Sequence, residues 1–273
     1  MKVALVTGAS SGIGESTAVE LQKAGYTVYA AARRVQRMEG LATWGIRVLE
    51  MDVTDDESMV AGVEQIIADA GRIDLLVNNA GYGSYGAFED VPLSEGKYQF
   101  EVNVFGLARL VQLVVPHMRR QKSGRIVNVS SIGGKIYEPL GGWYHSTKFA
   151  VEGLSDSLRL ELKPFGIDVV VIQPGAIKTE WSGIAVDNLR KRSGEGAYSE
   201  QVRQLSAFFS QADRGSDPKV IADVIVKAAQ ARRPRTRYAA GFGAGPILLA
   251  RRVLSDRAFD AMFLGAMRRA AKA

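Results

Sequence analysis

Short apolar runs alternate along this chain with longer stretches of helical periodicity, and this order limits the possible folds more than any other feature. Six apolar runs predict strands, at residues 3–7, 27–32, 47–51, 75–78, 125–129 and 168–173. Four longer stretches predict helices, at residues 14–24, 55–69, 93–121 and 143–163, with Thr54 and Ser94 as N-caps. Several strands are apolar on both faces, as in a sheet covered by helices on each side. The pattern predicts an α/β fold with a doubly wound parallel sheet, which binds ligands at the carboxyl ends of its strands.

The length and the rare residue types exclude several kinds of site. At 273 residues the chain can bury one sizeable core, so we expect a single domain over 1–273. Cysteine is absent, which excludes disulfides, thiolate metal sites and cysteine nucleophiles, and two histidines make an imidazole metal cage implausible. No apolar run approaches the roughly 18 residues of a membrane span. We therefore expect a cytoplasmic protein without a bound metal.

The net charge of +6 is concentrated near the C-terminus. From Arg232 onward, ten lysines and arginines face only two acidic residues, Asp256 and Asp260, so the rest of the chain is close to neutral. A basic tail of this kind can touch an acidic membrane or nucleic acid, or it can be a solvated helical face. We expect the solvated face, no nucleic-acid partner, and membrane contact through the C-terminal helix as the less favoured alternative.

The first predicted strand runs into the sequence TGASSGIG at residues 7–14, a glycine-rich turn from strand to helix. A backbone without Cβ atoms can approach a pyrophosphate closely, and the helix N-terminus adds free N–H groups and a partial positive charge. Its place directly after a strand favours this interpretation over a merely tight turn. The residues that we assign to a cofactor in this turn are Gly8, Ser10, Ser11, Gly12, Ile13 and Gly14.

The end of the second predicted strand carries the signal for cofactor choice. An acidic residue there would bond the ribose 2′-hydroxyl of NAD, whereas an arginine can pair with the 2′-phosphate of NADP. This chain has Ala32, then Arg33 and Arg34, and no carboxylate before Glu39. The sequence favours NADP(H); the alternative is that the two arginines open a solvated helix.

Tyr144 and Lys148 form a candidate acid/base pair. They are four residues apart in a predicted helix, so both side chains lie on one face. A free tyrosine titrates near pH 10, and a nearby cation favours its charged form, so the pair can be tuned to move a proton. Such spacing alone is more often an exposed helical pair. Ser131 changes that balance, because it follows a predicted strand at the end where ligands bind, with Ser130 as the competing hydroxyl.

Together with the three glycines, the tetrapeptide NNAG at 78–81, and Asn103, these residues make the chain resemble the short-chain dehydrogenase/reductase family over roughly residues 2–181. The resemblance implies a seven-stranded Rossmann-like sheet, a nicotinamide cofactor, and interconversion of alcohol and carbonyl. It also implies that Ser131 rather than Ser130 polarises the carbonyl, that Lys148 holds the nicotinamide ribose, and that Asn103 supports a water-linked proton path.

The resemblance adds further cofactor contacts. Asp52 would meet the adenine edge, with Val53 packed nearby, although Asp52 could equally be a helix-capping neighbour. The NNAG segment and the turn after the sixth strand would approach the cofactor through their backbones, the latter beside the nicotinamide carboxamide. The additional residues assigned in this way are Asn79, Ala80, Gly81, Tyr144, Lys148, Pro174, Gly175, Ile177 and Thr179.

The part of the chain after the family's shared region is expected to shape the substrate site. Residues 181–216 would form a variable lid, in which Tyr198, Phe208 and Phe209 either line an apolar pocket or simply pack together. Residues 235–273 would add a strand and an amphipathic helix that covers the pocket, as in members that resemble 17β-hydroxysteroid and retinol dehydrogenases. We expect His145, beside Tyr144, to be structural because it points away around the helix.

These observations predict an NADP(H)-dependent oxidoreductase for an apolar carbonyl compound or secondary alcohol, such as a steroid, retinoid or long-chain alcohol. The main alternative is a 3-oxoacyl-carrier-protein reductase, and a different class is a catalytically silent NADP sensor. Family members commonly pair through their two long helices, so we expect a homodimer or homotetramer.

Overall fold

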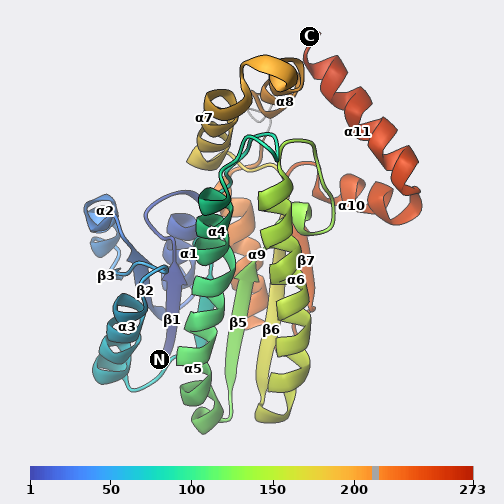
Figure 1. Cartoon of the computed structure of the whole chain (residues 1–273). Coiled ribbons are helices and arrows are strands. Elements are labelled where there is room, and N and C mark those ends of the chain that lie inside the picture. Colours follow the sequence, from blue (N-terminus) through green and yellow to red (C-terminus); the bar gives the residue numbers. More distant parts are fainter. Residues whose placement is uncertain (211–214, 273) are drawn as a thin grey trace.

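The computed structural model, which describes residues 1–210 and 215–272, contains one parallel sheet of seven strands (Figure 1). Their order is β3-β2-β1-β4-β5-β6-β7, so the chain starts in the middle of the sheet and winds outward in both directions. All six predicted strands are present, and the seventh lies in the predicted C-terminal extension. The bounds are β1 (Lys2–Thr7), β2 (Tyr26–Ala32), β3 (Arg47–Glu50), β4 (Leu75–Asn78), β5 (Gly124–Val129), β6 (Ile167–Pro174) and β7 (Arg237–Ala240). The predicted doubly wound α/β fold is confirmed.

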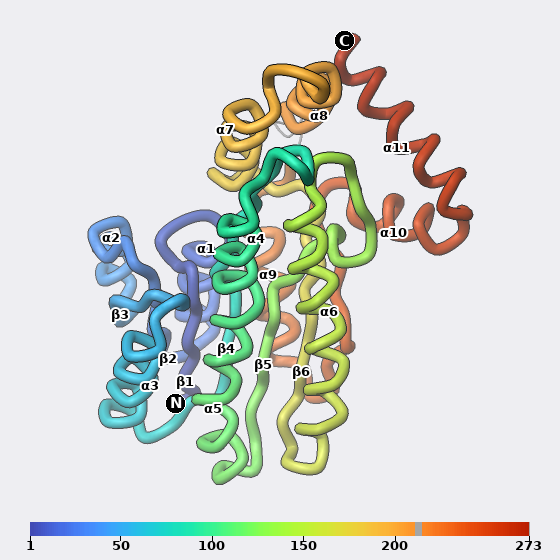
Figure 2. The backbone as a smooth tube through the Cα atoms, viewed as in Figure 1, coloured from blue at the N-terminus to red at the C-terminus, as the bar shows by residue number. Residues whose placement is uncertain are grey.

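Helices cover both faces of the sheet, as the apolar strands require (Figures 1 and 2). One face packs against α1 (Gly12–Lys23), α2 (Glu39–Ala42) and α9 (Pro218–Gln230). The other packs against α3 (Asp56–Ala70), α5 (Gly106–Gln121) and α6 (Gly142–Leu162). Short helical turns connect these elements: η1 (Val35–Met38), η3 (Ile132–Gly134) and η4 (Lys163–Phe165). Both layers are continuous hydrophobic clusters, so the strands are buried between them.

Two predicted N-caps are wrong by one or two positions. Helix α3 is capped by Asp55, whose carboxylate accepts the N–H groups of Glu57 and Ser58, while the Thr54 hydroxyl donates to Asp52. Helix α4 (Leu93–Phe100) starts directly after Pro92, so Ser94 already lies inside it. At α3, the carboxylate of Asp55 is a good acceptor for the free N–H groups of the first turn. At α4, the restricted φ angle of Pro92 suits the residue that precedes the first turn.

The helix predicted over 93–121 is interrupted by a π-helical turn, η2 (Glu101–Phe105), between α4 and α5. A π-turn inserts one extra residue and often marks a functional position. Here it carries Asn103, a predicted site residue, which is buried. Hydrophobic periodicity alone did not reveal the interruption.

The helices of the predicted lid and of the extension after β7 lie beyond the carboxyl ends of the strands (Figure 1). The lid contains α7 (Glu180–Ser193), η5 (Gly196–Tyr198) and α8 (Ser199–Ser210), and its residues 211–214 lie outside the described part of the chain. The extension has two helices, α10 (Ala244–Val253) and α11 (Asp256–Ala270), where one was predicted, because Ser255 caps a new helix; residue 273 is likewise outside the described residues. Within the described residues, no helix is long and apolar enough to cross a membrane.

Gly106 allows α5 to approach the loop after β3. A Cβ atom at Gly106 would overlap the carbonyl oxygen of Val53, and a backbone oxygen cannot rotate away. Gly153, in the interior of α6, is exposed and has no atom near the corresponding position. The same substitution should therefore have opposite effects at the two sites.

We predict that Gly106→Ala lowers the free energy of unfolding by about 1–3 kcal/mol through overpacking. Gly153→Ala, its matched control, should raise it by about 0.5–1 kcal/mol because alanine loses less backbone entropy in a helix. Urea unfolding followed by circular dichroism measures both. Equal effects at the two positions would mean that the close approach at Gly106 does not constrain the helix.

Candidate functional site

The glycine turn after β1 is held against the end of β4. Gly8 and Gly12 have φ angles of +64° and +57°, which side-chain-bearing residues rarely adopt. A Cβ atom at Gly8 would lie 2.8 Å from Cα of Ala80, and one at Gly14 would overlap the carbonyl oxygen of Gly8. The hydroxyl of Thr7 accepts the N–H groups of Asn79 and Ala80, each at 3.1 Å. The turn is therefore preorganised by protein contacts.

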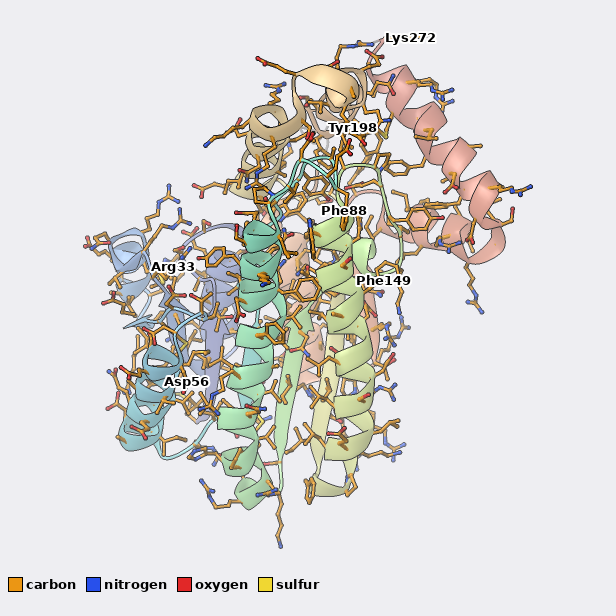
Figure 3. The ribbon with its side chains drawn as sticks, in the orientation of Figure 1. Arg33, Asp56, Phe88, Phe149, Tyr198 and Lys272 are labelled. Atoms are coloured by element: carbon orange, nitrogen blue, oxygen red, sulfur yellow. The ribbon has the colours of Figure 1, made fainter. Side chains whose placement is uncertain are left out.

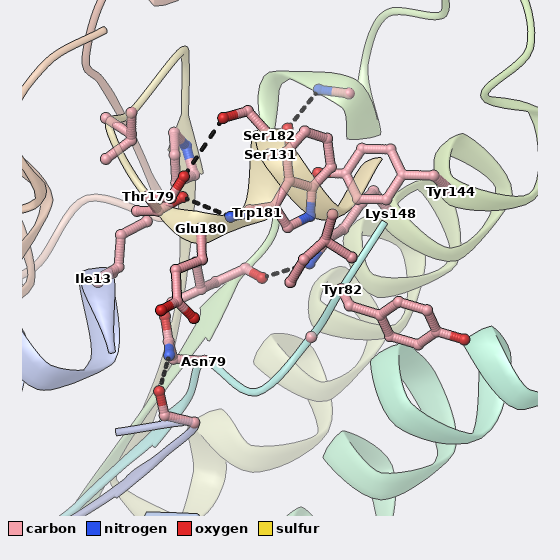
Figure 4. Close-up of a pocket in the computed structure, with 18 of the residues that line it drawn as sticks. Ile13, Asn79, Tyr82, Ser131, Tyr144, Lys148, Thr179, Glu180, Trp181 and Ser182 are labelled. Carbon is pink, nitrogen blue, oxygen red and sulfur yellow. Dashed lines mark hydrogen bonds between the residues drawn. The ribbon is translucent and has the colours of Figure 1, made fainter. Parts of the chain in front are cut away.

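A cavity of about 710 Å³ opens over this edge of the sheet and collects most of the predicted site. Figure 4 shows Ser131, Tyr144 and Lys148 on one side of it and Ile13 and Asn79 on the other. The predicted residues that line it are Gly8, Ser10, Ser11, Gly12, Ile13, Arg33, Arg34, Asp52, Val53, Asn79, Ala80, Gly81, Ser131, Tyr144, Lys148, Pro174, Gly175, Ile177 and Thr179. Neither Gly14 nor Asn103 lines the cavity. Gly14 instead allows the turn to pack tightly, because a Cβ atom there would overlap the carbonyl oxygen of Gly8.

The end of the cavity near β2 is rich in hydrogen-bond donors. Arg34 donates to the hydroxyls of Ser10 and Ser11, at 3.2 and 3.5 Å, and also lies 3.5 Å from Glu180. Arg33 extends on the side of α2 (Figure 3), where it donates to the Tyr98 hydroxyl at 3.1 Å. With the N-terminus of α1 beside them, these groups fit the phosphates of a dinucleotide. The turn and the arginines thus suit a nicotinamide dinucleotide.

Asp52 holds the turn before α3 and is not the cap of that helix, which is Asp55. The Oδ1 atom of Asp52 accepts both the N–H and the hydroxyl of Thr54, at 2.9 and 2.8 Å. It also lines the cavity, and its Oδ2 lies 3.8 Å from Arg33. The hydrogen bonds from Thr54 hold the Asp52 carboxylate at the cavity wall, so this role is compatible with the predicted contact to the adenine edge.

Tyr144 and Lys148 are both buried, and burial dominates their protonation. It raises the pKa of Tyr144; hydrogen bonding with Ser131 acts in the opposite direction, and the charge of Glu138 adds to the rise. Burial also lowers the pKa of Lys148 to about 8, against the charge of Glu152. The Lys148 amine donates to the carbonyl oxygen of Val129 at 3.0 Å. Within the protein alone, these groups favour a neutral phenol that can donate a proton. The expectation that the lysine and an oxidised nicotinamide together lower the pKa of Tyr144 stays a prediction.

Ser131 is better placed than Ser130 to act with this tyrosine. Its hydroxyl accepts the N–H of Gly133 at 3.0 Å, and its interaction with the Tyr144 phenol acts to lower the pKa of that tyrosine. Ser130 also lines the cavity, but its buried hydroxyl has no partner among the described residues. The choice of Ser131 over Ser130 stays a prediction.

Asn103 positions the loop after β4 from behind the cavity. Its side-chain amide donates to the carbonyl oxygen of Tyr82 at 2.9 Å and to the hydroxyl of Thr147 at 3.0 Å, while its Oδ1 accepts the Tyr82 N–H at 3.0 Å. A Cβ atom at Gly81 would lie 3.0 Å from Asn103 Oδ1 and 3.7 Å from the Lys148 amine. Asn103 is thus close to Lys148, and its part in a proton path stays a prediction.

The opposite end of the cavity is aromatic. The Tyr85 ring lies 5.7 Å from that of Tyr144, 5.8 Å from that of Trp181 and 5.3 Å from that of Phe209, measured between centroids. Phe208 lines the cavity and packs against Phe263 of α11 at 5.4 Å. Residues of the predicted lid and of the extension therefore line this end of the cavity together.

Sequence reasoning missed several residues of this wall, including Tyr85, Glu138 and Trp181, and it included one that is absent from it. Tyr85 and Glu138 lie in loops and Trp181 lies in the first turn of α7, and no local sequence pattern there indicates a site. Tyr198 does not line it and lies out beside the lid helices (Figure 3). The place of Tyr85 and Trp181 in the cavity wall results from packing between the lid and the loop that carries Tyr85, which are far apart in the sequence.

His145 does not point fully away, because it borders the cavity and its ring centroid lies 5.5 Å from that of Tyr144. That it is structural stays a prediction, which its contacts with the loop before α6 support. Its Nδ1 lies 2.9 Å from the carbonyl oxygen of Gly133, and its Nε2 accepts the backbone N–H of Glu138 at 3.2 Å. Burial lowers the pKa of His145, but interaction with the Glu138 side chain outweighs burial and the pKa is raised. The imidazole therefore fixes the loop that carries Glu138.

The lowered pKa of Lys148 predicts a pH-dependent cost in stability. The folded state holds this amine with a pKa of about 8, below the ordinary lysine value of 10.5, so it disfavours the charged form. The penalty is full below pH 8 and is relieved as the pH rises from 8 to about 10.5. Lys148→Met should therefore be more stable than the wild type at pH 7, and its advantage should shrink by about 3 kcal/mol by pH 10.5.

Urea unfolding of both proteins from pH 7 to pH 10 measures this difference. Glu64, an exposed acidic residue of α3 far from the cavity, provides a control substitution, Glu64→Gln, which should show no such trend. Wild-type and Lys148→Met stabilities that stay parallel over the whole range would contradict the burial of a costly amine.

Comparison with known proteins agrees with this arrangement. The profile of the short chain dehydrogenase family matches residues 2–189. The chain is 37% identical over 242 residues to a 3-ketodihydrosphingosine reductase of Bacteroides thetaiotaomicron, covering 88% of each chain. It is 34% identical over 262 residues to a probable short-chain type dehydrogenase/reductase, VdlC, of Helicobacter pylori, covering 96% of each.

Solved structures show the same fold with nicotinamide cofactors. A short-chain dehydrogenase from Streptomyces avermitilis superposes with a TM-score of 0.81 at 35% identity, over 98% of this chain and 97% of that one. An alcohol dehydrogenase from Thermococcus sibiricus, complexed with 5-hydroxy-NADP, has a TM-score of 0.73 at 26% identity, over 89% and 97%. An enzyme from Burkholderia phymatum in complex with NAD has a TM-score of 0.77 at 25% identity, over 91% and 90%. Relatives of this fold thus bind either form of the cofactor.

Proposed function

The chain belongs to the short-chain dehydrogenase family, and from that membership we propose that it is an NADP(H)-dependent oxidoreductase that interconverts apolar ketones and secondary alcohols. The observation that carries the proposal is a single cavity that joins the glycine turn, the Ser131, Tyr144 and Lys148 set, and an aromatic wall. A binding module without chemistry would have no use for a buried phenol and amine at this junction, because burying both groups costs free energy.

The protein groups divide the acid and base work between them. Ser131 hydrogen-bonds the carbonyl oxygen, and Tyr144, a neutral phenol in this site, donates its proton to that oxygen as the alcohol forms. The nicotinamide, when bound, supplies the hydride in this direction and accepts it in the reverse. Lys148 stabilises the phenolate left on Tyr144 by its charge, since Tyr144 and Lys148 share one face of α6. Alcohol oxidation uses the same groups with the proton moving to Tyr144.

The aromatic wall supports an apolar substrate. Tyr85, Trp181, Phe208, Phe209 and Phe263 leave little that could solvate a highly polar molecule. The similarity to a protein named 3-ketodihydrosphingosine reductase supports a ketone on a long chain. The alternative, reduction of a 3-oxoacyl group on an acidic carrier protein, would draw on the basic tail. Faster turnover of acetoacetyl thioesters than of ketones of equal chain length would favour that alternative.

The choice of NADP(H) rests on Arg33 and Arg34. Arg34 is the better candidate for the 2′-phosphate, because it joins the hydroxyls of Ser10 and Ser11 in one cluster of donors. Arg33 is partly engaged by Tyr98 and Asp52. Arg37, three residues after Arg34, pairs with Glu180 and does not line the cavity, which makes it a matched control.

We predict that Tyr144→Phe lowers kcat for the oxidation of NADPH by a medium-chain ketone at least about 100-fold, because no other group replaces the phenolic proton. Tyr29→Phe removes a hydroxyl from the core between β2 and α3, distant from the cavity, and should leave kcat within about twofold. Steady-state kinetics with both variants measure the effect. Unchanged turnover by Tyr144→Phe would refute the acid/base role and leave the NADP sensor as the better description.

We predict that Arg34→Ala raises the KM for NADPH about 10- to 100-fold, the range expected for lost hydrogen bonds between charged groups, and changes the KM for NADH far less. Arg37→Ala should change neither by more than about threefold. Parallel titrations of the two cofactors at a fixed ketone concentration measure these values. Equal losses with NADPH and NADH would mean that Arg34 does not recognise the 2′-phosphate.

A further inference from the structure

A row of aromatic rings runs from the reacting end of the cavity to the C-terminal extension. The row starts where the Trp181 ring lies 5.0 Å from that of Tyr144, measured between centroids (Figure 4). Trp181 lies 6.3 Å from Phe209, Phe209 lies 6.4 Å from Phe208, and Phe208 lies 5.4 Å from Phe263 of α11. All five residues line the same cavity. An apolar path therefore leads from the phenol of Tyr144 to α11.

Phe263, at the far end of this path, is supported from behind. It is 6% exposed, and the ring of Phe259, one helical turn earlier on α11, lies 6.3 Å away in a stacked arrangement. Phe259 is fully buried and does not line the cavity. It is held in turn by the ring of Tyr137 at 5.7 Å and by the guanidinium group of Arg251 at 5.6 Å. Because protein interiors are close-packed, a ring that is supported in this way resists displacement.

A substrate chain in this path is fixed at one end and limited at the other. The reacting oxygen binds at Tyr144 and Ser131, so the chain can extend only away from them. Each methylene group that packs along the rings leaves water, which strengthens binding about fourfold. A methylene group that reaches Phe263 finds no further apolar space, and forcing it in would overpack the site. The length of the path should therefore determine the preferred chain length.

We propose that Phe263 sets the upper limit on the length of the substrate's apolar chain, by closing the aromatic path that begins at Tyr144. The proposal rests on the proposed function, since Tyr144 and Ser131 bind the reacting oxygen and so fix the other end of the substrate. Phe263 belongs to α11, so the C-terminal extension determines which members of a series of ketones are accepted. Phe208, on the lid helix α8, packs against the same ring and completes the path between lid and extension.

The kinetic test measures kcat/KM with NADPH for a series of unbranched methyl ketones, from hexan-2-one to tetradecan-2-one. In the wild type we expect kcat/KM to rise about fourfold with each added methylene group and then to stop rising at a limiting chain length. Phe263→Ala, which opens space at the end of the path, should lengthen that limit by at least about two methylene groups. Phe263→Trp, which enlarges the ring, should shorten it.

Phe259→Ala is the matched control. It removes the same bulk from the same helix, but at a position outside the cavity. It should leave the limiting chain length unchanged even if it lowers the free energy of unfolding as much as Phe263→Ala does, which urea unfolding measures. If Phe259→Ala and Phe263→Ala lengthen the limit equally, a general loosening of α11 explains the shift and the proposal is overturned. A limit that neither substitution of Phe263 moves would overturn it as well.

Calorimetric binding of the same ketones with NADP⁺ present tests the inference without turnover, because two oxidised compounds cannot exchange a hydride. We expect the affinity to reach the same limiting chain length in the wild type and to show the same lengthening in Phe263→Ala. Equal limits in these two proteins would overturn the role of Phe263 even if the ketones are reduced with NADPH. A limit that moves with Phe263, in a protein that reduces none of the ketones, would instead overturn the proposed function and leave the role of Phe263 standing.

Discussion

The close approach of β1 and β4 at their carboxyl ends is the constraint on which the whole site depends. The two strands are neighbours at the point where the chain reverses its winding direction, and such a switch point leaves a crevice above the sheet. Thr7, Gly8 and Ala80 close the base of that crevice through hydrogen bonds and a backbone contact that tolerates no Cβ atom. The glycine turn, the donors beside α1 and the loop toward Lys148 all take their positions from this contact.

The site also buries ionisable groups, and this burial lowers the free energy of unfolding. Lys148 and Tyr144 both lie in surroundings that favour their neutral forms. One helical turn beyond Lys148, Glu152 is buried and accepts hydrogen bonds from Gln173 and Arg237, at 2.9 and 2.8 Å. This network ties α6 to β6 and β7, so the strand added by the C-terminal extension also supports the helix that carries the site. A chain selected for stability alone would place apolar residues at these positions.

Sequence reasoning reached the fold and most of the cavity floor because those features are local. A strand is recognised by its own residues, and the glycines, NNAG, Tyr144 and Lys148 follow strands or share a helix face. It failed where the outcome depends on contacts between distant segments. The π-turn at Asn103 and the convergence of Tyr85, Glu138 and Trp181 follow from tertiary packing. The wall that selects the substrate is built almost entirely from such contacts, which is why the reaction class was easier to predict than the substrate.

The most direct test of the central claim is the transfer of deuterium from NADPH labelled at the hydride position of its nicotinamide to a medium-chain ketone. The wild type is incubated with the labelled cofactor and the ketone, and the alcohol is analysed by mass spectrometry. We expect an alcohol with one deuterium on the carbinol carbon, formed by the wild type and not by a heat-inactivated sample. An alcohol without deuterium, or no alcohol from any apolar ketone supplied, would contradict the proposed hydride transfer.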